Sequence, residues 1–207
     1  MALSVEFQTL TKFKKARRGS LFFTKDFLRF GNAKAVSKAL ERLVEKGEII
    51  RVARGIYTRQ EIDPILGPLT PGADSIAKAI AKRDKARIVP TGALALNALG
   101  LTTQVPMNVV YYTDGAARKI YIGKRKIVFK KTSPKNLATI GRTSQLVIQA
   151  LREIGKDNLT EKELEIILNH LIKEEKHRLE HDILLAPEWI RKIMRKALWA
   201  KTQLNEQ

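Results

Sequence analysis

Cationic side chains recur at helical spacing between Asn32 and Lys46, and they are the residues of this chain best suited to binding an anion. Lys34, Lys38 and Arg42 follow one another at four-residue intervals, which places them on one face of a helix beside Ser37. Ammonium and guanidinium groups pair with phosphates, and a hydroxyl can hydrogen-bond to a phosphate or a base edge. We therefore expect Lys34, Ser37 and Lys38 to approach bases or phosphates, and Arg42 to contact the nucleic-acid backbone.

The elements that would position these side chains lie between Ser20 and Arg59. A first short helix is expected over Lys25–Phe30 with Thr24 as its N-cap, and Asn32 can cap a second helix that stops at Gly47. The second helix has an apolar face for packing, formed by Val36, Leu40, Leu43 and Val44. Two β-rich runs around a glycine turn then predict a hairpin. This order is that of a winged helix-turn-helix, in which the second helix enters a DNA major groove and the hairpin is the wing.

More cations flank this unit on both sides. Arg51 and Arg54 fall in the predicted hairpin, where they would anchor the wing to the DNA backbone or the minor groove. A basic run before the unit would neutralise flanking phosphates, and it contains Lys14, Lys15, Arg17 and Arg18. The alternatives left open are a solvated helix end for the basic run and a winged helix that contacts protein instead of DNA.

The charge of the chain is large and unevenly distributed. The formal net charge is +18 at pH 7. Residues 1–62 carry 14 Lys and Arg against 6 Asp and Glu, and residues 63–141 carry 13 against 4, whereas residues 142–207 hold 12 against 11. Solubility alone would not require such segregation, so the pattern favours a polyanionic partner, here double-stranded DNA.

Composition excludes several other classes of protein. The chain has no cysteine, which rules out disulfides, thiolate metal sites and a cysteine nucleophile and fits a reducing cytoplasm. The first residues lack a secretory-signal pattern, and no apolar stretch approaches the roughly 18 residues needed to span a bilayer. We expect a cytoplasmic protein that does not associate with membranes.

The rest of the chain predicts a second domain and an overall α+β fold. Residues 61–72 are rich in Pro and Gly and read as a linker, so we place the domain boundary between residues 62 and 63. Residues 63–207 should form an α+β domain with a helix over residues 73–83, a buried Ala/Leu helix over residues 93–99, and a small antiparallel sheet at about 105–132. Helices should fill residues 142–207, one of them opened by a Thr160–Glu163 capping box and the last by Pro187.

Three segments in order suggest a family. Arg54–Tyr57 (RGIY) is followed by residues 90–106 (PTGALALNALGLTTQVP) and then by Tyr112–Gly115 (YTDG). The combination, which covers most of the chain, resembles the AbiE-type abortive-infection antitoxins of type IV toxin–antitoxin systems and a closely related bacterial family of DUF6088 type.

The resemblance implies a two-part protein. Its winged helix would bind inverted repeats in the promoter of its own operon and repress it, while the second domain would neutralise a nucleotidyltransferase-like toxin. The DNA-contacting residues implied by the resemblance are Lys34, Lys38, Arg42 and Arg54. No catalytic residue is implied, so we expect no enzymatic activity.

Other chemistries have weaker support. Residues 170, 174, 177 and 181 place three His and one Glu on one face of a continuing helix, but lysines and glutamates surround them, so we expect a solvated face and no metal or cofactor. The four aspartates of residues 63–141 are too sparse for a paired-carboxylate nuclease site. Tyrosines in the predicted sheet could stack RNA bases, which keeps an RNA-binding alternative open; they are Tyr111, Tyr112 and Tyr121.

Overall fold

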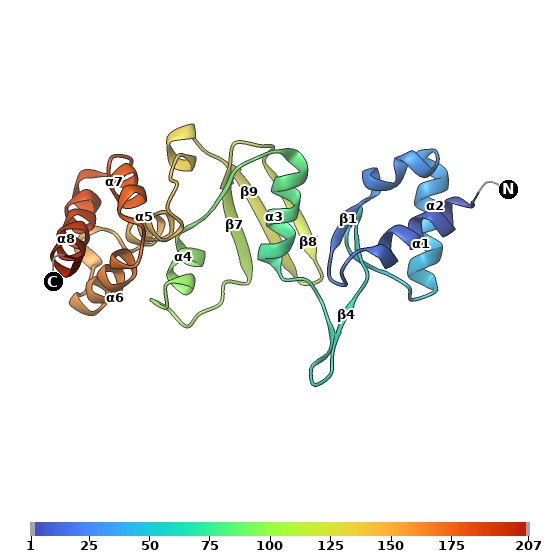
Figure 1. Ribbon diagram of the computed structural model, residues 1–207, viewed down its shortest axis with the longest axis horizontal. Helices are drawn as coiled ribbons and strands as arrows, with labels where there is room; N and C mark the ends of the chain where they lie inside the picture. The colour runs from blue at the N-terminus through green and yellow to red at the C-terminus, as the bar shows by residue number, and fades with distance from the viewer. Residues whose placement is uncertain (1–2, 206–207) are drawn as a thin grey trace. The chain divides into compact units, whose positions relative to one another are not determined.

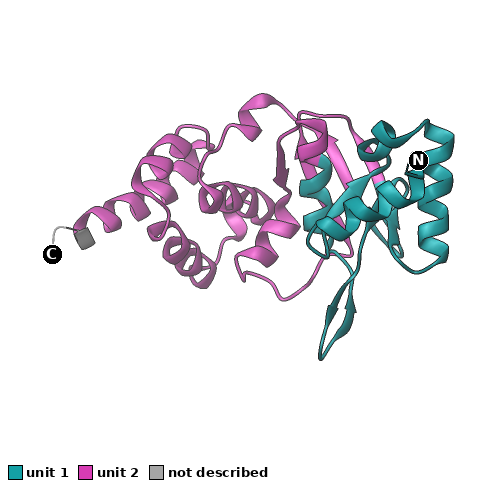
Figure 2. Cartoon of the chain, turned by 45° about the vertical axis from the view of Figure 1, so that its right-hand side comes forward, with its two compact units in different colours: residues 1–80, 120–126 teal, residues 81–119, 127–207 magenta. Residues whose placement is uncertain are grey.

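The protein has an α+β fold that divides into two compact units, each described here by itself (Figure 2). The computed structural model describes residues 3–205. Unit 1 runs from the N-terminal end of the described chain to Ile80 and includes Ile120–Lys126. Unit 2 comprises Ala81–Lys119 and the chain from Ile127 onward. The boundary expected at 62/63 falls inside unit 1.

Unit 1 packs two helices and a short 3-10 helix on a three-stranded sheet (Figure 1). Its elements are α1 (Val5–Lys15), β1 (Leu21–Phe23), η1 (Thr24–Phe30), α2 (Ala33–Glu45), β2 (Ile50–Ala53) and β3 (Ile56–Thr58). The strands lie in the order β1-β3-β2, so β1 extends the predicted hairpin by a third strand. Phe13 of α1 stacks on Phe27 of η1 with 5.1 Å between ring centroids, at the centre of an apolar core that includes Leu40 and Leu43.

Helix α2 forms as the sequence predicts. The Asn32 side chain accepts a hydrogen bond from the Ala35 N–H at 2.9 Å, which satisfies one of the free donors of the first turn. Four residues of its inner face are buried, namely Val36, Ala39, Leu40 and Leu43.

The element before α2 differs from the prediction. It is a 3-10 helix, and Thr24 is not its N-cap: the cap is Phe23, whose N–H donates to the Asp26 carboxylate at 2.7 Å. The Thr24 N–H instead donates to the Gly55 carbonyl at 3.2 Å, because the chain is still adjacent to the β2–β3 turn at that point. This tertiary contact overrides the local capping preference of threonine.

The segment expected as a linker is an ordered hairpin. Strands β4 (Glu61–Asp63) and β5 (Gly67–Leu69) pair antiparallel, so the segment expected as a linker or wrapped connector contains a regular hairpin. Asp63 organises the turn, since its carboxylate accepts the Ile65 and Leu66 N–H groups at 2.8 Å each. Hydrogen bonding from these two N–H groups holds the pKa of the Asp63 carboxyl below its usual value.

Helix α3 (Ala73–Asp84) crosses from unit 1 into unit 2, and a four-stranded sheet follows. The strands are β6 (Ile88–Pro90), β7 (Asn108–Thr113), β8 (Arg118–Ile122) and β9 (Arg125–Lys131), in the order β6-β7-β9-β8. Strands β7, β8 and β9 lie within residues 105–132, where the sequence predicted the sheet, and β6 extends it from outside that range. Helix α4 (Gly92–Ala98) packs on α5 through one side only, so the expectation that it is buried all round was wrong: Ala93 and Ala98 are exposed.

The remainder is helical, as expected. The elements are η2 (Pro134–Leu137), α5 (Arg142–Ile154), η3 (Lys156–Asn158), α6 (Glu161–Ile172), α7 (Lys176–Ile183) and α8 (Glu188–Asn205). The capping box that starts α6 is confirmed: Thr160 Oγ1 accepts the Glu163 N–H at 3.3 Å, and Glu163 accepts the Thr160 N–H at 2.9 Å. Within the described chain, each helix is too short or too polar to cross a bilayer.

Candidate nucleic-acid interface

The outer face of α2 is open to solvent and carries the predicted cations. Lys34, Ser37, Lys38 and Arg42 are all exposed, while the opposite face of the helix is fully buried in the core of unit 1. The amphipathic pattern therefore fixes which side of α2 is free. That side presents a hydroxyl and three cations along three turns of helix.

The cations of this face differ in what they contact. Arg42 Nη1 lies 3.7 Å from Glu6 Oε2 of α1, and Lys46 pairs with the same carboxylate. The Lys46 hydrogen bond is the main reason why the pKa of Glu6 is lowered, with smaller contributions from Arg42. Lys34 and Lys38 have no carboxylate partner among the residues that the structure describes. Their charge is available to an outside anion, whereas that of Arg42 is partly neutralised.

The β2–β3 hairpin of the same unit adds two exposed arginines. Arg51 lies on β2 and Arg54 in the turn before β3, and neither is ion-paired in the described part of the chain. Gly55 makes the turn possible, since its φ of +72° lies in the left-handed region. Arg51 and Arg54 are thus the exposed cations of a hairpin in which Val52, Ala53 and Ile56–Thr58 are buried.

The basic run at the end of α1 divides into two kinds of residue. Lys14 and Lys15 are exposed near the helix end. Arg17 lies 3.9 Å from the Glu61 carboxylate, and Arg18 donates to the Gln60 carbonyl at 3.0 Å. Both arginines thus contact the start of β4, at Gln60 and Glu61, a relationship that sequence spacing did not reveal.

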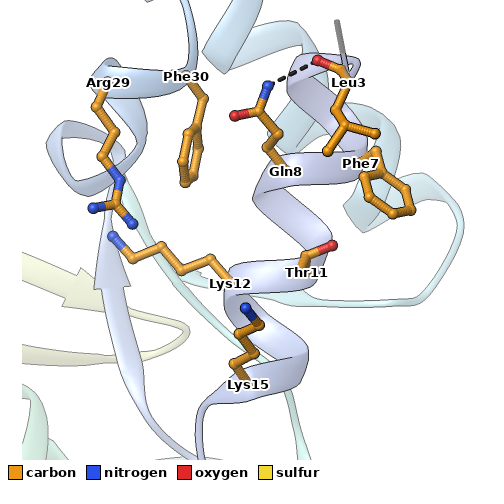
Figure 3. A pocket seen from close by; sticks show the side chains of 8 residues that line it. All are labelled: Leu3, Phe7, Gln8, Thr11, Lys12, Lys15, Arg29 and Phe30. Carbon is orange, nitrogen blue, oxygen red and sulfur yellow. Dashed lines mark hydrogen bonds between the residues drawn. The ribbon is translucent and has the colours of Figure 1, made fainter. Parts of the chain in front are cut away.

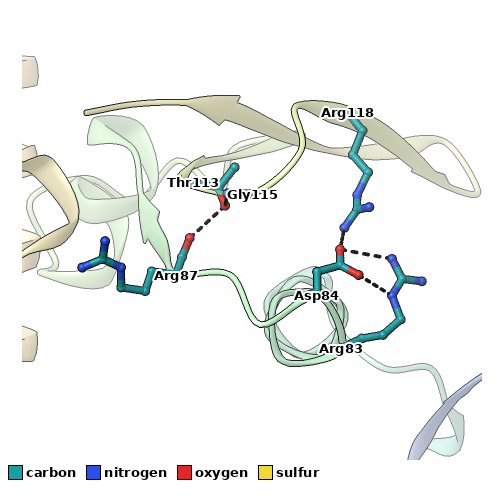
Figure 4. Close-up of polar contacts among 6 residues, drawn as sticks. All are labelled: Arg83, Asp84, Arg87, Thr113, Gly115 and Arg118. Atoms are coloured by element: carbon teal, nitrogen blue, oxygen red, sulfur yellow. Dashed lines mark hydrogen bonds and ion pairs between the residues drawn. The ribbon is translucent and has the colours of Figure 1, made fainter. Parts of the chain in front are cut away.

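Asp84 and Asp114, in the middle of the chain, pair with different arginines and do not form a carboxylate pair. Asp84 pairs with Arg83 and Arg118 (Figure 4). Asp114 accepts from the Arg87 backbone N–H at 2.7 Å and from Arg87 Nε at 2.8 Å. Arg83 is the main cause of the low pKa of Asp84, about 2. These contacts fix the edges of the sheet, since Thr113 Oγ1 also donates to the Arg87 carbonyl at 2.8 Å.

The expected continuing helix with four potential metal ligands does not form. Helix α6 ends at its C-cap, Lys173, and α7 begins after Glu175, which breaks the four-residue spacing. His170 instead contacts the Leu99 carbonyl at 3.1 Å, and His181 pairs with Asp182 at 2.8 Å. No cluster of three or more His, Cys, Asp or Glu suited to a metal occurs within residues 3–205.

Only part of the predicted tyrosine set is accessible. Tyr111 is buried and stacks on Phe129 at 6.1 Å between ring centroids, so it cannot stack on a base. Tyr112 is half-buried, and Tyr121 is 67% exposed.

Sequence reasoning missed an exposed aromatic residue on the last helix. Trp199 of α8 is 68% exposed, and a shallow cavity beside it is lined by Lys192, Arg195 and Lys196. The signal was available, because Lys192, Arg195, Lys196 and Trp199 follow at intervals of three, one and three residues and share a helix face. Such a combination suits binding to an acidic partner.

Comparisons with known proteins cover most of the chain without giving a function. A family model described as "Family of unknown function (DUF6088)" matches residues 8–179. No curated protein matches the sequence. The crystal structure of the RV2827C protein from Mycobacterium tuberculosis is similar at 12% identity with a TM-score of 0.43, over 95% of this chain and 81% of that chain. No functional inference follows from so distant a likeness.

Proposed function

Because this chain belongs to the DUF6088 family, whose function is unknown, we propose a function from its own residues: a sequence-specific regulator that binds duplex DNA. In this proposal residues 1–62 act as a winged helix-turn-helix, with α2 as the recognition helix and the β2–β3 hairpin as the wing. The order α1, β1, η1, α2, β2, β3 supports it. The protein would act in the cytoplasm.

One observation carries the proposal. Lys34 and Lys38 are exposed on the free face of α2 without a carboxylate partner among the described residues, and Arg54 is equally free on the adjoining hairpin. Unneutralised cations on a helix and a hairpin of one unit suit simultaneous contact with a groove and the flanking phosphates. Since Arg42 shares Glu6 with Lys46, we assign it a weaker backbone contact.

The double variant Lys38→Ala/Arg54→Ala tests the proposal. Its affinity for a fragment of the promoter upstream of its own gene should fall by about 10-fold or more at moderate salt, and the slope of log affinity against log salt should lessen by about 2. The matched control is Lys162→Ala/Lys176→Ala, which removes the same charge from exposed positions on α6 and α7. Unchanged affinity, or an equal loss in the control, would contradict DNA binding through α2 and the hairpin.

We further propose that this regulator is an antitoxin of type IV. It would repress its own operon from inverted repeats in the promoter and neutralise a nucleotidyltransferase-like toxin through its last third. Support comes from the motif resemblance and from the exposed Trp199 with its cationic neighbours, which suits a partner with an acidic surface.

Co-purification with the product of the adjacent gene tests this part. Trp199→Ser should abolish capture while leaving DNA binding intact, whereas Met107→Ser, at a comparably exposed apolar side chain, should leave both intact. If the Trp199→Ser variant still co-purifies with the product of the adjacent gene, binding at α8 is contradicted.

Competition between single-stranded RNA and the promoter fragment tests the RNA-binding alternative. If the RNA outcompetes the promoter fragment, RNA binding replaces DNA regulation as the proposed function.

A further inference from the structure

A cavity of about 250 Å³ opens between α1 and η1 in unit 1 (Figure 3). One part of its lining is apolar and comes from Leu3, Phe7 and Phe30. The other part is cationic and comes from Lys12, Lys15 and Arg29. Among the described residues, no acidic side chain lines it. The cavity therefore combines apolar surface with a group of cationic side chains.

The apolar part is exposed without being used by the fold. Leu3 is 60% and Phe7 54% exposed, although the core of unit 1 lies directly beneath α1. Leu3 precedes α1 and Phe7 lies in its first turn, and both line the cavity. A ligand with a hydrocarbon body would remove this surface from water.

Among the described residues, none of the three cations that line the cavity forms an ion pair, although the Asp26 carboxylate acts on Lys12. Lys12 Nζ donates to the Asp26 carbonyl at 2.6 Å and lies 5.0 Å from the centre of the Phe27 ring, which holds it in place in a half-buried position. The Arg29 guanidinium lies 4.8 Å from the centre of the Phe30 ring. Burial lowers the pKa of Lys12, the nearby Asp26 carboxylate opposes that shift, and the charge of Arg29 adds to it to a smaller extent. An anion between the two cations would offset that repulsion.

We propose that this cavity binds a small amphipathic carboxylate, with the carboxylate between Lys12 and Arg29 and the hydrocarbon body against Leu3, Phe7 and Phe30. Arg29 offers the planar donor pair that a carboxylate prefers. A DNA phosphate is a poorer occupant, because it would leave the three apolar side chains facing a charged backbone. The site uses neither α2 nor the β2–β3 hairpin and shares only Lys15 with the basic run expected to contact DNA phosphates, so it can be tested apart from DNA binding.

Calorimetric titration of the full chain tests the site with octanoate as the probe. Octanol lacks the charge and inorganic phosphate lacks the apolar body, so each should bind about 10-fold or more weakly than octanoate. Amide spectra should place the octanoate-induced shifts at Gln8, Thr11 and Arg29. Equal binding of octanol, equal binding of phosphate, or no binding of octanoate would each overturn the proposal.

Variants then locate the binding. Arg29→Gln should weaken octanoate binding about 10-fold, and Lys15→Gln should weaken it by a smaller factor. Lys14→Gln is the matched control, because Lys14 is an exposed cation of the same helix that does not line the cavity. Arg29 is exposed, so its replacement should leave the melting temperature unchanged. Octanoate binding that survives Arg29→Gln would show that the ligand lies elsewhere and would refute the assignment.

Discussion

Asp182 of α7 accepts a hydrogen bond at 2.8 Å from the backbone N–H of Gly141, the residue that precedes α5. Its other carboxylate oxygen accepts the Ile140 N–H at 2.9 Å, and Glu174 accepts the Thr143 N–H at 2.7 Å. Both acids are buried. The start of α5 is thus capped by side chains more than thirty residues away, and this ties three helices of unit 2 together.

Gly141→Ala should strongly destabilise this junction. A Cβ at position 141 would lie 2.8 Å from Glu174 Oε2 and 2.9 Å from Asp182 Oδ2, so both carboxylates must move and lose hydrogen bonds. We expect a loss of about 2–3 kcal/mol in the free energy of unfolding, measured by urea titration. Gly72→Ala is the control, since no atom lies within 4 Å of its added Cβ. A loss as small as that of the control would refute the close packing at Gly141.

Glu6→Gln should strengthen DNA binding if α2 is the contact surface. The change removes a negative charge and releases Arg42 and Lys46 from their shared partner. We expect affinity for the promoter fragment to rise about 3-fold and the salt dependence to become steeper, measured by fluorescence anisotropy over a salt series. Glu165→Gln, on an exposed position of α6, should leave affinity unchanged. Weaker binding of Glu6→Gln by a folded protein would count against the proposed surface.

Asn32→Ala should lower the stability of unit 1. Loss of the hydrogen bond to the Ala35 N–H leaves a donor of the first turn of α2 without its partner, which costs about 1 kcal/mol. Thermal or urea denaturation followed by circular dichroism measures the loss. Asn32→Asp preserves the acceptor and should retain the stability; an equal loss in both variants would exclude capping as the cause.

Asp84→Asn should make stability less dependent on pH in the acid range. Hydrogen bonds from Arg83, and then from Arg118, lower the pKa of Asp84 from 3.8 to about 2. A carboxylate whose pKa is lower in the folded state stabilises the fold above its unfolded pKa and loses that effect as pH falls toward the folded pKa. The Asp84→Asn variant should therefore be less stable than the unmodified protein at pH 7, and this difference in stability should disappear between about pH 4 and pH 2.

The size of this effect should be modest, up to about 1 kcal/mol, because the group is partly exposed to solvent. Melting temperatures measured from pH 7 down to pH 2 follow it. Asp157→Asn provides the comparison, since Asp157 is exposed and has no ion-pair partner in the described part of the chain. If the melting temperature of Asp84→Asn differs from that of the unmodified protein by the same amount at every pH, the ion pairs of Asp84 are not the cause of the difference.

The sequence by itself determined α2 and its exposed face. The Asn32 cap and the apolar stripe of Val36, Leu40 and Leu43 act within one helix, so local pattern is enough to fix the helix and its buried side. The same holds for the Thr160–Glu163 capping box and for strands β7, β8 and β9, whose β-rich runs and intervening turns are local signals.

Only the tertiary structure decided which charges are free and which helices are continuous. Arg42 is paired because α1 brings Glu6 beside it, and Arg17 because β4 brings Glu61. The predicted helix through His170 and His181 breaks because buried Glu174 caps the start of α5 instead of lying on a solvated face. The contacts join residues 31 to 44 positions apart. Their proximity depends on packing of whole elements, which neither spacing nor composition encodes.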